Sequence, residues 1–279
     1  MNELLFGTVG SPISIPKKPG GSVGAIQQTA ALGLGAMELG WVQSVRVSEK
    51  TCADIKITSK QQDIKLSVHA PYFINLNASD EEWPKSRKRL MDACHFGNLA
   101  GATDIIFHPG SYFAAEPSEV YKKAFPRLLD CANELKRNDN PVNLRPETMG
   151  KSAMLGSLED TVQMALLDPK IKPCLDFAHL HARAGDGSMN SETEWSKLLE
   201  YYAKQLGEDS LQKLHIHLSG IEYSQKGERN HLPLKESDFD LIGLFKALKA
   251  MNCGGRVLCE SPIMETDALL MKETWQSLV

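Results

Sequence analysis

The sequence lacks an apolar run of the roughly 18 residues that a transmembrane helix needs, and its first residues show no secretory pattern. Its six cysteines are scattered, without a C-x-x-C pair or the framework of a small secreted domain. The formal net charge of −4 argues against a non-specific nucleic-acid coat, although it leaves room for a basic mouth on an acidic body. We therefore expect a cytoplasmic protein with reduced thiols and no membrane partner. We expect a monomer, although the sequence contains no direct signal of oligomeric state.

What the sequence does contain is a regular alternation of β-prone and helical segments. Eight β-prone runs occur at 3–8, 36–40, 64–69, 103–108, 141–147, 172–177, 212–218 and 256–260. Seven helical stretches separate them and an eighth covers 266–278, which is the count for an α/β protein of the (β/α)₈ TIM barrel class. An open doubly wound sheet is the alternative, but no G-x-G-x-x-G follows the first run. Without a repeat or linker, we expect a single TIM-barrel domain over residues 1–279.

Several of these helices have a predicted start. A serine followed three residues later by an acid is a capping pattern, because each side chain can bond the backbone N–H of the other residue. The pattern opens four of the predicted helices, at Ser79 with Glu82, Ser157 with Asp160, Ser191 with Glu194, and Ser237 with Asp240.

The stretch CLDFAHLHARAG, residues 174–185, places an aspartate and two histidines in or directly after a β-prone run. A lone D-x-x-H pattern decides nothing, but seven of the eight histidines lie near the end of a predicted strand or in the loop beyond it. The exception is His95, which falls within a predicted helix. The imidazoles and carboxylates in such positions are His69, His108, Glu147, Asp176, His179, His181, His215, His217, His231 and Glu260.

This distribution predicts a metal centre. The strands of a closed barrel are parallel, so their C-terminal ends meet on one face. A hydrogen-bonded polar plug explains any single residue, whereas divalent cations compensate the burial of the whole set. One catalytic zinc uses about three protein ligands, so the set predicts two or three ions, with zinc as first choice and manganese as the alternative. Two ions that lie about 3.5–4 Å apart and share a carboxylate can clamp a phosphate ester.

Taken in order, these motifs resemble the endonuclease IV family of zinc-dependent apurinic/apyrimidinic endonucleases. The motifs are HAPYFINL with His69, HPGS with His108, ETMG with Glu147, LDFAH with Asp176 and His179, HLS at 217–219, His231 and Glu260. They cover about two-thirds of the chain, and the resemblance is weak before residue 64. It implies a (β/α)₈ barrel that hydrolyses DNA on the 5′ side of an abasic site in base-excision repair, leaving a 3′-hydroxyl and a 5′-deoxyribose phosphate.

The resemblance also implies roles for individual residues. The ligands would be His69, His108 and Glu147 for a first zinc, Glu147, Asp176, His217 and Glu260 for a second, and His179 and His231 for a third. Glu147 would bridge the first two ions, between which a hydroxide attacks phosphorus, and it is the predicted catalytic residue. His215 faces the same side as His217 and is an alternative ligand from that strand.

The sequence departs from the family pattern beside the third zinc. The family usually has an aspartate two residues before the histidine that matches His231, and this chain has Arg229 there. We therefore predict Glu228 as the substitute ligand. His181 and His215 are additional histidines, which we interpret as groups that orient ligands in preference to a further metal role.

The predicted partner is double-stranded DNA that contains an abasic site. Tyr72 and Phe73 match a tyrosine and a bulky apolar residue that wedge into the minor groove, although Phe73 as a buried loop anchor is an equal reading. Arg46 and Arg229 are candidate DNA contacts. Further basic residues predicted near the mouth are Lys17, Lys18, Lys151, Arg183, Lys226 and the run KSRKR at 85–89.

Two other functions stay open. A sugar isomerase or epimerase related to xylose isomerase would use Glu147, Asp176, His217 and Glu260 around one or two manganese, magnesium or cobalt ions. Such an enzyme has no need of the histidines at 69, 108, 179 and 231 as ligands, which favours phosphodiester hydrolysis. A barrel that binds damaged DNA without cutting it is the second alternative, because the third site is altered.

Overall fold

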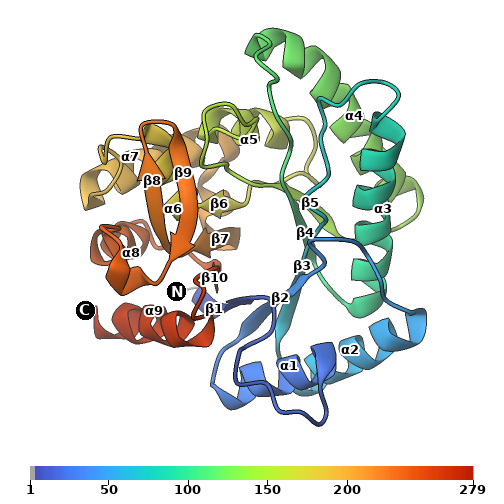
Figure 1. The fold of residues 1–279 in the computed structure, drawn as a ribbon, viewed down its shortest axis with the longest axis vertical. Helices are drawn as coiled ribbons and strands as arrows, with labels where there is room; N and C mark the ends of the chain where they lie inside the picture. Colours follow the sequence, from blue (N-terminus) through green and yellow to red (C-terminus); the bar gives the residue numbers. More distant parts are fainter. Residues whose placement is uncertain (1–3, 279) are drawn as a thin grey trace.

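The computed structural model describes residues 4–278 of the chain. Within that range, eight parallel strands form one curved sheet with helices packed outside it (Figure 1). The hydrogen-bonded order of these strands is β5-β4-β3-β2-β1-β10-β7-β6. Their bounds are β1 (Leu4–Val9), β2 (Ala36–Gly40), β3 (Lys65–His69), β4 (Asp104–Phe107), β5 (Asn143–Pro146), β6 (Leu175–Asp176), β7 (Leu214–Leu218) and β10 (Gly255–Cys259), and a separate hairpin consists of β8 (Gly220–Ser224) and β9 (Gly227–Leu232).

The sheet closes on itself between β5 and β6. The backbone N–H of Cys174 donates to the carbonyl of Pro146 at 3.0 Å, and the N–H of Thr148 donates to the carbonyl of Cys174 at 3.0 Å. Glu147 and Cys174 accordingly form a parallel bridge. An open doubly wound sheet has two free edges, so this pairing excludes it. The predicted (β/α)₈ barrel is confirmed.

Helices cover the outside of the barrel. They are α1 (Gly21–Ala31), α2 (Glu49–Gln61), α3 (Trp83–Ala100), α4 (Pro117–Arg137), α5 (Leu158–Ala165), α6 (Phe177–Ala184), α7 (Glu192–Leu206), α8 (Leu241–Ala250) and α9 (Glu265–Ser277), with short 3₁₀ turns η1 (Glu208–Lys213) and η2 (Leu234–Glu236). Phe107, Trp195 and Phe245 are fully buried in the apolar core, and all six cysteines are buried and free. No helix within residues 4–278 is long and apolar enough to cross a membrane.

Each predicted β-prone run overlaps one barrel strand, whereas the predicted helix starts are only partly correct. The N–H of Asp160 donates to Oγ of Ser157 at 3.1 Å, and the N–H of Ser157 donates to Oδ2 of Asp160 at 2.7 Å, so the predicted capping box begins α5. Ser191 does precede α7, but its hydroxyl bonds the carboxylate of Glu194 instead of a backbone N–H.

The other two predicted starts are wrong by three residues. Helix α3 begins after Glu82, because Pro84 suits the first turn of a helix and the preceding residues form a turn. Helix α8 begins after Asp240, whose own carboxylate accepts the N–H of Gly243 at 2.9 Å. The hydroxyl of Ser237 is engaged elsewhere, by the N–H of Phe239.

The helix α6 and the β8–β9 hairpin at the barrel mouth were not predicted (Figure 1). His179 and His181 lie on α6, and His231 lies on β9, where the sequence had suggested loops. Gly227 begins β9 with a φ of +92°, and a Cβ atom there would lie 2.2 Å from the carbonyl oxygen of Gly150. Only glycine allows the hairpin to approach that loop so closely.

Candidate metal centre

Nine polar side chains gather at the C-terminal end of the barrel, and we call them the rim cluster. Six come from the ends of β3, β4, β5, β6, β7 and β10 because parallel strands bring these ends to one face. The other three come from α6 and the hairpin. The members are His69, His108, Glu147, Asp176, His217 and Glu260 from the strands, and His179, Glu228 and His231 from α6 and β9.

Glu147 lies at the centre of the rim cluster and is fully buried. Its Oε2 lies 3.3 Å from Nε2 of His69 and 3.4 Å from Nε2 of His108. Its Oε1 lies 3.3 Å from Nδ1 of His217 and 3.4 Å from Nδ1 of His179. The two oxygens therefore point to different sides, Oε2 toward His69 and His108 and Oε1 toward His217, as a bridging carboxylate requires.

Glu260 connects the central part of the rim cluster to the hairpin. Its Oε1 lies 3.3 Å from Nδ1 of His217, and its Oε2 lies 3.7 Å from Nε2 of His231. The rings of His231 and His179 meet edge to face with their centres 5.3 Å apart. The histidine of the hairpin therefore faces the same space as the histidine of α6.

The hairpin also contributes an acid to the rim cluster. Oε2 of Glu228 lies 3.7 Å from Nε2 of His179. The next residue, Arg229, is exposed and its guanidinium lies 3.2 Å from Oε1 of Glu222. Glu228 is therefore the residue that places a carboxylate beside His179, and its role as the substitute ligand stays a prediction.

Hydrogen bonds orient three of the imidazoles. Nδ1 of His69 lies 2.9 Å from the carbonyl of the next residue, and Nδ1 of His179 lies 3.0 Å from the carbonyl of Thr148. A carbonyl only accepts, so each Nδ1 holds a proton, and Nε2 is the nitrogen that can offer a lone pair once it is deprotonated. Nδ1 of His231 lies 2.6 Å from the hydroxyl of Ser219. In all three residues Nε2 is the nitrogen available to a metal ion.

The rim cluster concentrates charge, and five of its nine members are buried. Burial raises the pKa of Glu147, but the charge of His217 and the nearby imidazoles of His108 and His179 hold that pKa well below its usual range. Burial lowers the pKa of His69, but the nearby carboxylate of Glu147 raises that pKa to about 9. Without a cation, protons must hold these imidazoles and carboxylates together, and bound metal ions would displace such protons.

Two carboxylate oxygens of the rim cluster have unsatisfied hydrogen-bonding capacity. Oε2 of Glu147 and Oδ2 of Asp176 are buried and have no hydrogen-bond partner among the described residues. An unsatisfied buried acceptor costs about 1–3 kcal/mol, and a divalent cation would remove that cost. Donor atoms come within 4.8 Å of one another in three overlapping groups, which are His69, Glu147, His217 and Glu260; Glu147, Asp176, His179 and Glu260; and His179, His231 and Glu260. The donor set fits zinc.

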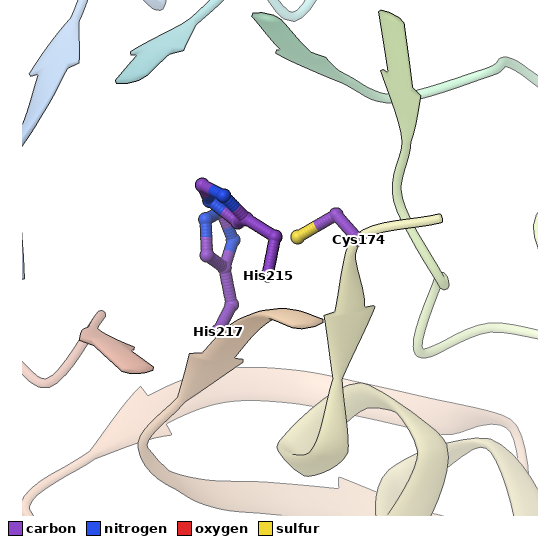
Figure 2. Close-up of side chains that lie close together, drawn as sticks. All are labelled: Cys174, His215 and His217. Carbon is purple, nitrogen blue, oxygen red and sulfur yellow. The ribbon is translucent and has the colours of Figure 1, made fainter. Parts of the chain in front are cut away.

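His215 does not belong to the rim cluster, and Glu38 explains where it lies. Nε2 of His215 is 3.0 Å from Oε2 of Glu38, inside the barrel, and both side chains are fully buried. Figure 2 shows His215 beside His217, with the sulfur of Cys174 facing the two rings. Glu38 and Cys174 were not predicted from the sequence. Glu38 could have been found as the one acid in the apolar run AMELG, residues 36–40, because a buried acid needs a partner.

His181 binds residues outside the rim cluster. Its Nδ1 lies 2.9 Å from the carbonyl of Met189, and its Nε2 lies 3.0 Å from Oδ1 of Asp238. The hydroxyl of Tyr223 donates to Oδ2 of Asp238 at 2.7 Å. His181 therefore joins α6 to the hairpin and does not itself orient a predicted ligand.

The loop after β3 places Tyr72 and Phe73 at the mouth, with exposures of 47% and 59%. The ring of Tyr72 stacks on His108 with the ring centres 5.1 Å apart. The guanidinium of Arg89 lies 5.9 Å from the centre of the Phe73 ring and donates to the carbonyl of Phe73 at 3.1 Å. The exposure of Phe73 excludes its reading as a buried anchor.

The predicted basic residues have different surroundings. Arg46 is exposed in the loop between β2 and α2. The guanidinium of Arg183 donates to several backbone carbonyls, including that of Met149 at 3.0 Å, and so holds the loop after β5. Arg87, from the KSRKR run, pairs with Asp130 on α4 at 2.9 Å. Of these three arginines, Arg46 is the one whose charge faces solvent without a partner among the described residues.

Six members of the rim cluster, including Glu228, line a hollow of about 230 Å³ together with Tyr72 and Met149. A larger hollow of about 940 Å³ lies at the opposite end of the barrel, beside Leu4 and Trp275. Its described walls contain no histidine and a single acid, Glu192. The side chains that could bind a metal ion therefore line the smaller hollow.

Comparison with known proteins extends the resemblance seen in the sequence. The family model of the xylose isomerase-like TIM barrel matches residues 26–278. A protein of Methanocaldococcus jannaschii described as uncharacterized is 39% identical, over 99% of this chain and 98% of its own length. A probable endonuclease 4 of Staphylococcus epidermidis is 26% identical, over 69% of this chain and 67% of its own length.

Solved structures share the fold. Endonuclease IV from Thermus thermophilus has a TM-score of 0.72 at 20% identity, covering 98% of this chain and 100% of that structure. A D-tagatose 3-epimerase-like protein has a TM-score of 0.70 at 17% identity, with coverages of 98% and 96%. These likenesses show the fold alone. With the family match and the endonuclease 4 relatives, the resemblance is confirmed, and the chain belongs to the xylose isomerase-like TIM barrel family.

Proposed function

We propose that this chain is a zinc-dependent phosphodiesterase of the endonuclease IV type, which hydrolyses DNA on the 5′ side of an abasic site in base-excision repair. The observation that supports this most is the position of Glu147, whose Oε2 faces His69 and His108 while its Oε1 faces His217. The probable endonuclease 4 relatives support the same chemistry. An acid shared between two metal ions is typical of enzymes that displace groups at phosphorus.

The proposed ligands are divided among three ions. They are His69, His108 and Glu147 for the first, Glu147, Asp176, His217 and Glu260 for the second, and His179, Glu228 and His231 for the third. Bound zinc ions would neutralise the phosphate charge and lower the pKa of a water molecule. The chain itself holds Glu147 between imidazoles that are oriented by backbone carbonyls, and it excludes bulk water from that carboxylate. The oxygen of one water molecule bonds to phosphorus, the bond from phosphorus to the 3′-oxygen breaks, and that oxygen takes a proton.

The proposed partner is duplex DNA with an abasic site. Phe73 is the best-placed wedge, because it is exposed at the mouth and held by Arg89. Tyr72 would stand beside the extruded nucleotide while its other face supports His108. Arg46 and Arg229 are exposed and would contact phosphates. We expect the protein to act as a monomer.

A sugar isomerase or epimerase on the same barrel is the alternative, because Glu147, Asp176, His217 and Glu260 would serve its metal site equally well. The remaining histidines favour the nuclease. Nε2 atoms of His69 and His108 lie within 3.4 Å of the same oxygen of Glu147, and they would hold a further ion beside the one that the isomerase set binds. Three zinc ions per chain would agree with the nuclease, whereas a single manganese would agree with the isomerase.

The deciding experiment uses a duplex oligonucleotide with one abasic site, incubated with the protein and zinc. The expected result is a single nick that leaves a 3′-hydroxyl, that is lost with a chelator and that returns with added zinc. A duplex without the abasic site should remain intact. Binding of the abasic duplex without a nick, with zinc present, would instead identify a binding protein.

A further inference from the structure

Glu38 lies inside the barrel on the far side of His217 from the rim cluster. It belongs to β2 and is fully buried. Its Oε2 accepts the hydroxyl of Ser67 at 2.7 Å and lies 3.0 Å from Nε2 of His215. Its Oε1 lies 3.1 Å from Nε2 of His217. One carboxylate thus contacts β3 through one oxygen and reaches β7 through both.

The two nitrogens of His217 face opposite partners. Nδ1 lies 3.3 Å from Oε1 of Glu147 and 3.3 Å from Oε1 of Glu260, in the rim cluster. Nε2 faces Oε1 of Glu38 at 3.1 Å. Neither Nε2 of His217 nor Oε1 of Glu38 has another hydrogen-bond partner within residues 4–278, so each is available to the other.

A buried carboxylate needs compensation, and its ion-pair partners in the described part of the chain are His215 and His217. An ionised carboxylate only accepts hydrogen bonds, so it favours the form of His217 that holds its proton on Nε2. The lone pair of Nδ1 then points at the rim cluster. Ser67 and His215 occupy the other oxygen of Glu38 and thereby keep Oε1 directed toward His217.

We propose that Glu38 is a positioning residue for metal binding, which orients His217 from inside the barrel so that Nδ1 is the ligand atom. The proposal rests on the proposed function in one respect, that His217 binds a metal ion. It is independent of the reaction that follows. A carboxylate behind a ligating imidazole fixes the ring and raises its basicity, and losing such a group typically costs about 10–100-fold in metal affinity.

The first test compares zinc affinity, measured by competition with a chromophoric chelator, in the wild type and in Glu38→Gln. Glutamine keeps the shape and removes the charge. We expect one zinc ion to bind about 10–100-fold more weakly, while the others change less. Ser67→Ala is the matched control, because it removes a hydrogen bond to Glu38 without touching His217, and its effect should be smaller. Wild-type affinity in a folded Glu38→Gln protein would overturn the proposal.

A second comparison separates positioning from a general structural effect. If Glu38 acts through His217, Glu38→Gln should cause no further loss of zinc affinity in a His217→Ala background. It should cause its full loss in a His108→Ala background, because His108 makes no contact with Glu38 among the described side chains. Equal losses in both backgrounds would contradict the proposal.

A third measurement needs no substitution at Glu38, so it remains decisive if that variant fails to fold. Nitrogen-15 NMR of the zinc-loaded wild type should show His217 protonated at Nε2, and protonation at Nδ1 would overturn the proposal. Cys174→Ser should leave the number of bound zinc ions unchanged. Loss of one ion would mean that Cys174, His215 and His217 form an interior metal site instead. If Glu38→Gln binds zinc more weakly but the wild type does not cut abasic DNA, the proposed function is refuted and the proposal for Glu38 stands.

Discussion

Asp176 uses its two carboxylate oxygens in different ways toward His179, three residues later. Oδ1 accepts the backbone N–H of His179 at 2.7 Å and caps α6, whereas Oδ2 lies 3.3 Å from Nδ1 of the His179 ring. The spacing D-x-x-H thus corresponds to the cap and the third position of a helix, which brings both side chains to the same helix end. Local structure and the metal centre share one residue.

The two roles of Asp176 are separable by substitution. Asn caps a helix about as well as Asp, but its neutral amide is a poor ligand, so Asp176→Asn should lose zinc while α6 stays capped. Asp176→Ala should lose the same zinc and about 1 kcal/mol more of unfolding free energy. Urea unfolding of the metal-free variants and zinc content check both. Equal stabilities of the two variants would show that the cap is unimportant.

Glu147→Gln should abolish cleavage of abasic DNA while leaving the fold intact. A neutral amide cannot bridge two cations, and a loss of several kcal/mol of transition-state stabilisation corresponds to about 10³-fold or more in rate. The measurements are single-turnover cleavage and thermal unfolding. Glu200→Gln, a change at an exposed residue of α7, is the control and should cut normally. Near-normal activity of Glu147→Gln would contradict the bridging role.

Glu228 and Arg229 are neighbours with different expected effects. Glu228→Ala should reduce the zinc content by one ion, because its carboxylate faces His179 across 3.7 Å. Arg229→Ala should retain all zinc and bind DNA more weakly, with a salt dependence reduced by about one phosphate contact. Metal analysis and titrations at several salt concentrations distinguish the two. A full zinc content in Glu228→Ala would remove it from the third site.

Phe73→Ala should weaken binding of an abasic duplex by about 1–3 kcal/mol, the usual worth of an aromatic ring stacked on a base. Zinc content should not change, because Phe73 touches no member of the rim cluster through a described aromatic contact. Tyr72 is a less clean target, since its ring stacks on His108. Ile57→Ala on α2, with an exposure of 55%, is the control and should bind normally.

Asp104 should make stability depend on acid pH. Its carboxylate lies 2.7 Å from Nε of Arg145 and 3.0 Å from Nη2 of Arg256, all largely buried. Burial raises the pKa of Asp104, but the charges of the two arginines hold it well below its usual range. The stabilisation is therefore present above the unfolded pKa, about 4, and is lost as the pH falls toward the folded pKa.

Asp104→Asn leaves the buried arginines without their anion and should cost about 3–5 kcal/mol at pH 7. The gap to the wild type should narrow below about pH 4, by up to about 1.4 kcal/mol per pH unit. Urea unfolding at pH 7, 4 and 3 gives both values. A gap that stays constant over this range would exclude Asp104 as the titrating group.

The number of strands and the order of the motifs could be predicted from the sequence because both depend on short segments. Apolar runs bounded by polar residues mark strands locally, and His69, Glu147 and Glu260 stand at the ends of such runs. The helix α6 could not be predicted from the sequence, because the two residues of β6 lead directly into it. Asp176 is both the last residue of β6 and the N-cap of α6. The hairpin was missed because its turn depends on Gly227 meeting the loop at Gly150.

The sequence by itself determined which residue types reach the mouth of the barrel, because the side-chain alternation of a strand and its end point are local properties. Only the tertiary structure decided between His215 and His217, which point the same way but differ in depth by about 6.6 Å along the strand. Register places His217 level with Leu258 and His215 level with Arg256, deeper in the barrel. Closure of the barrel then brings Glu38 from β2 against both, and no local pattern encodes a contact between strands so distant in the chain.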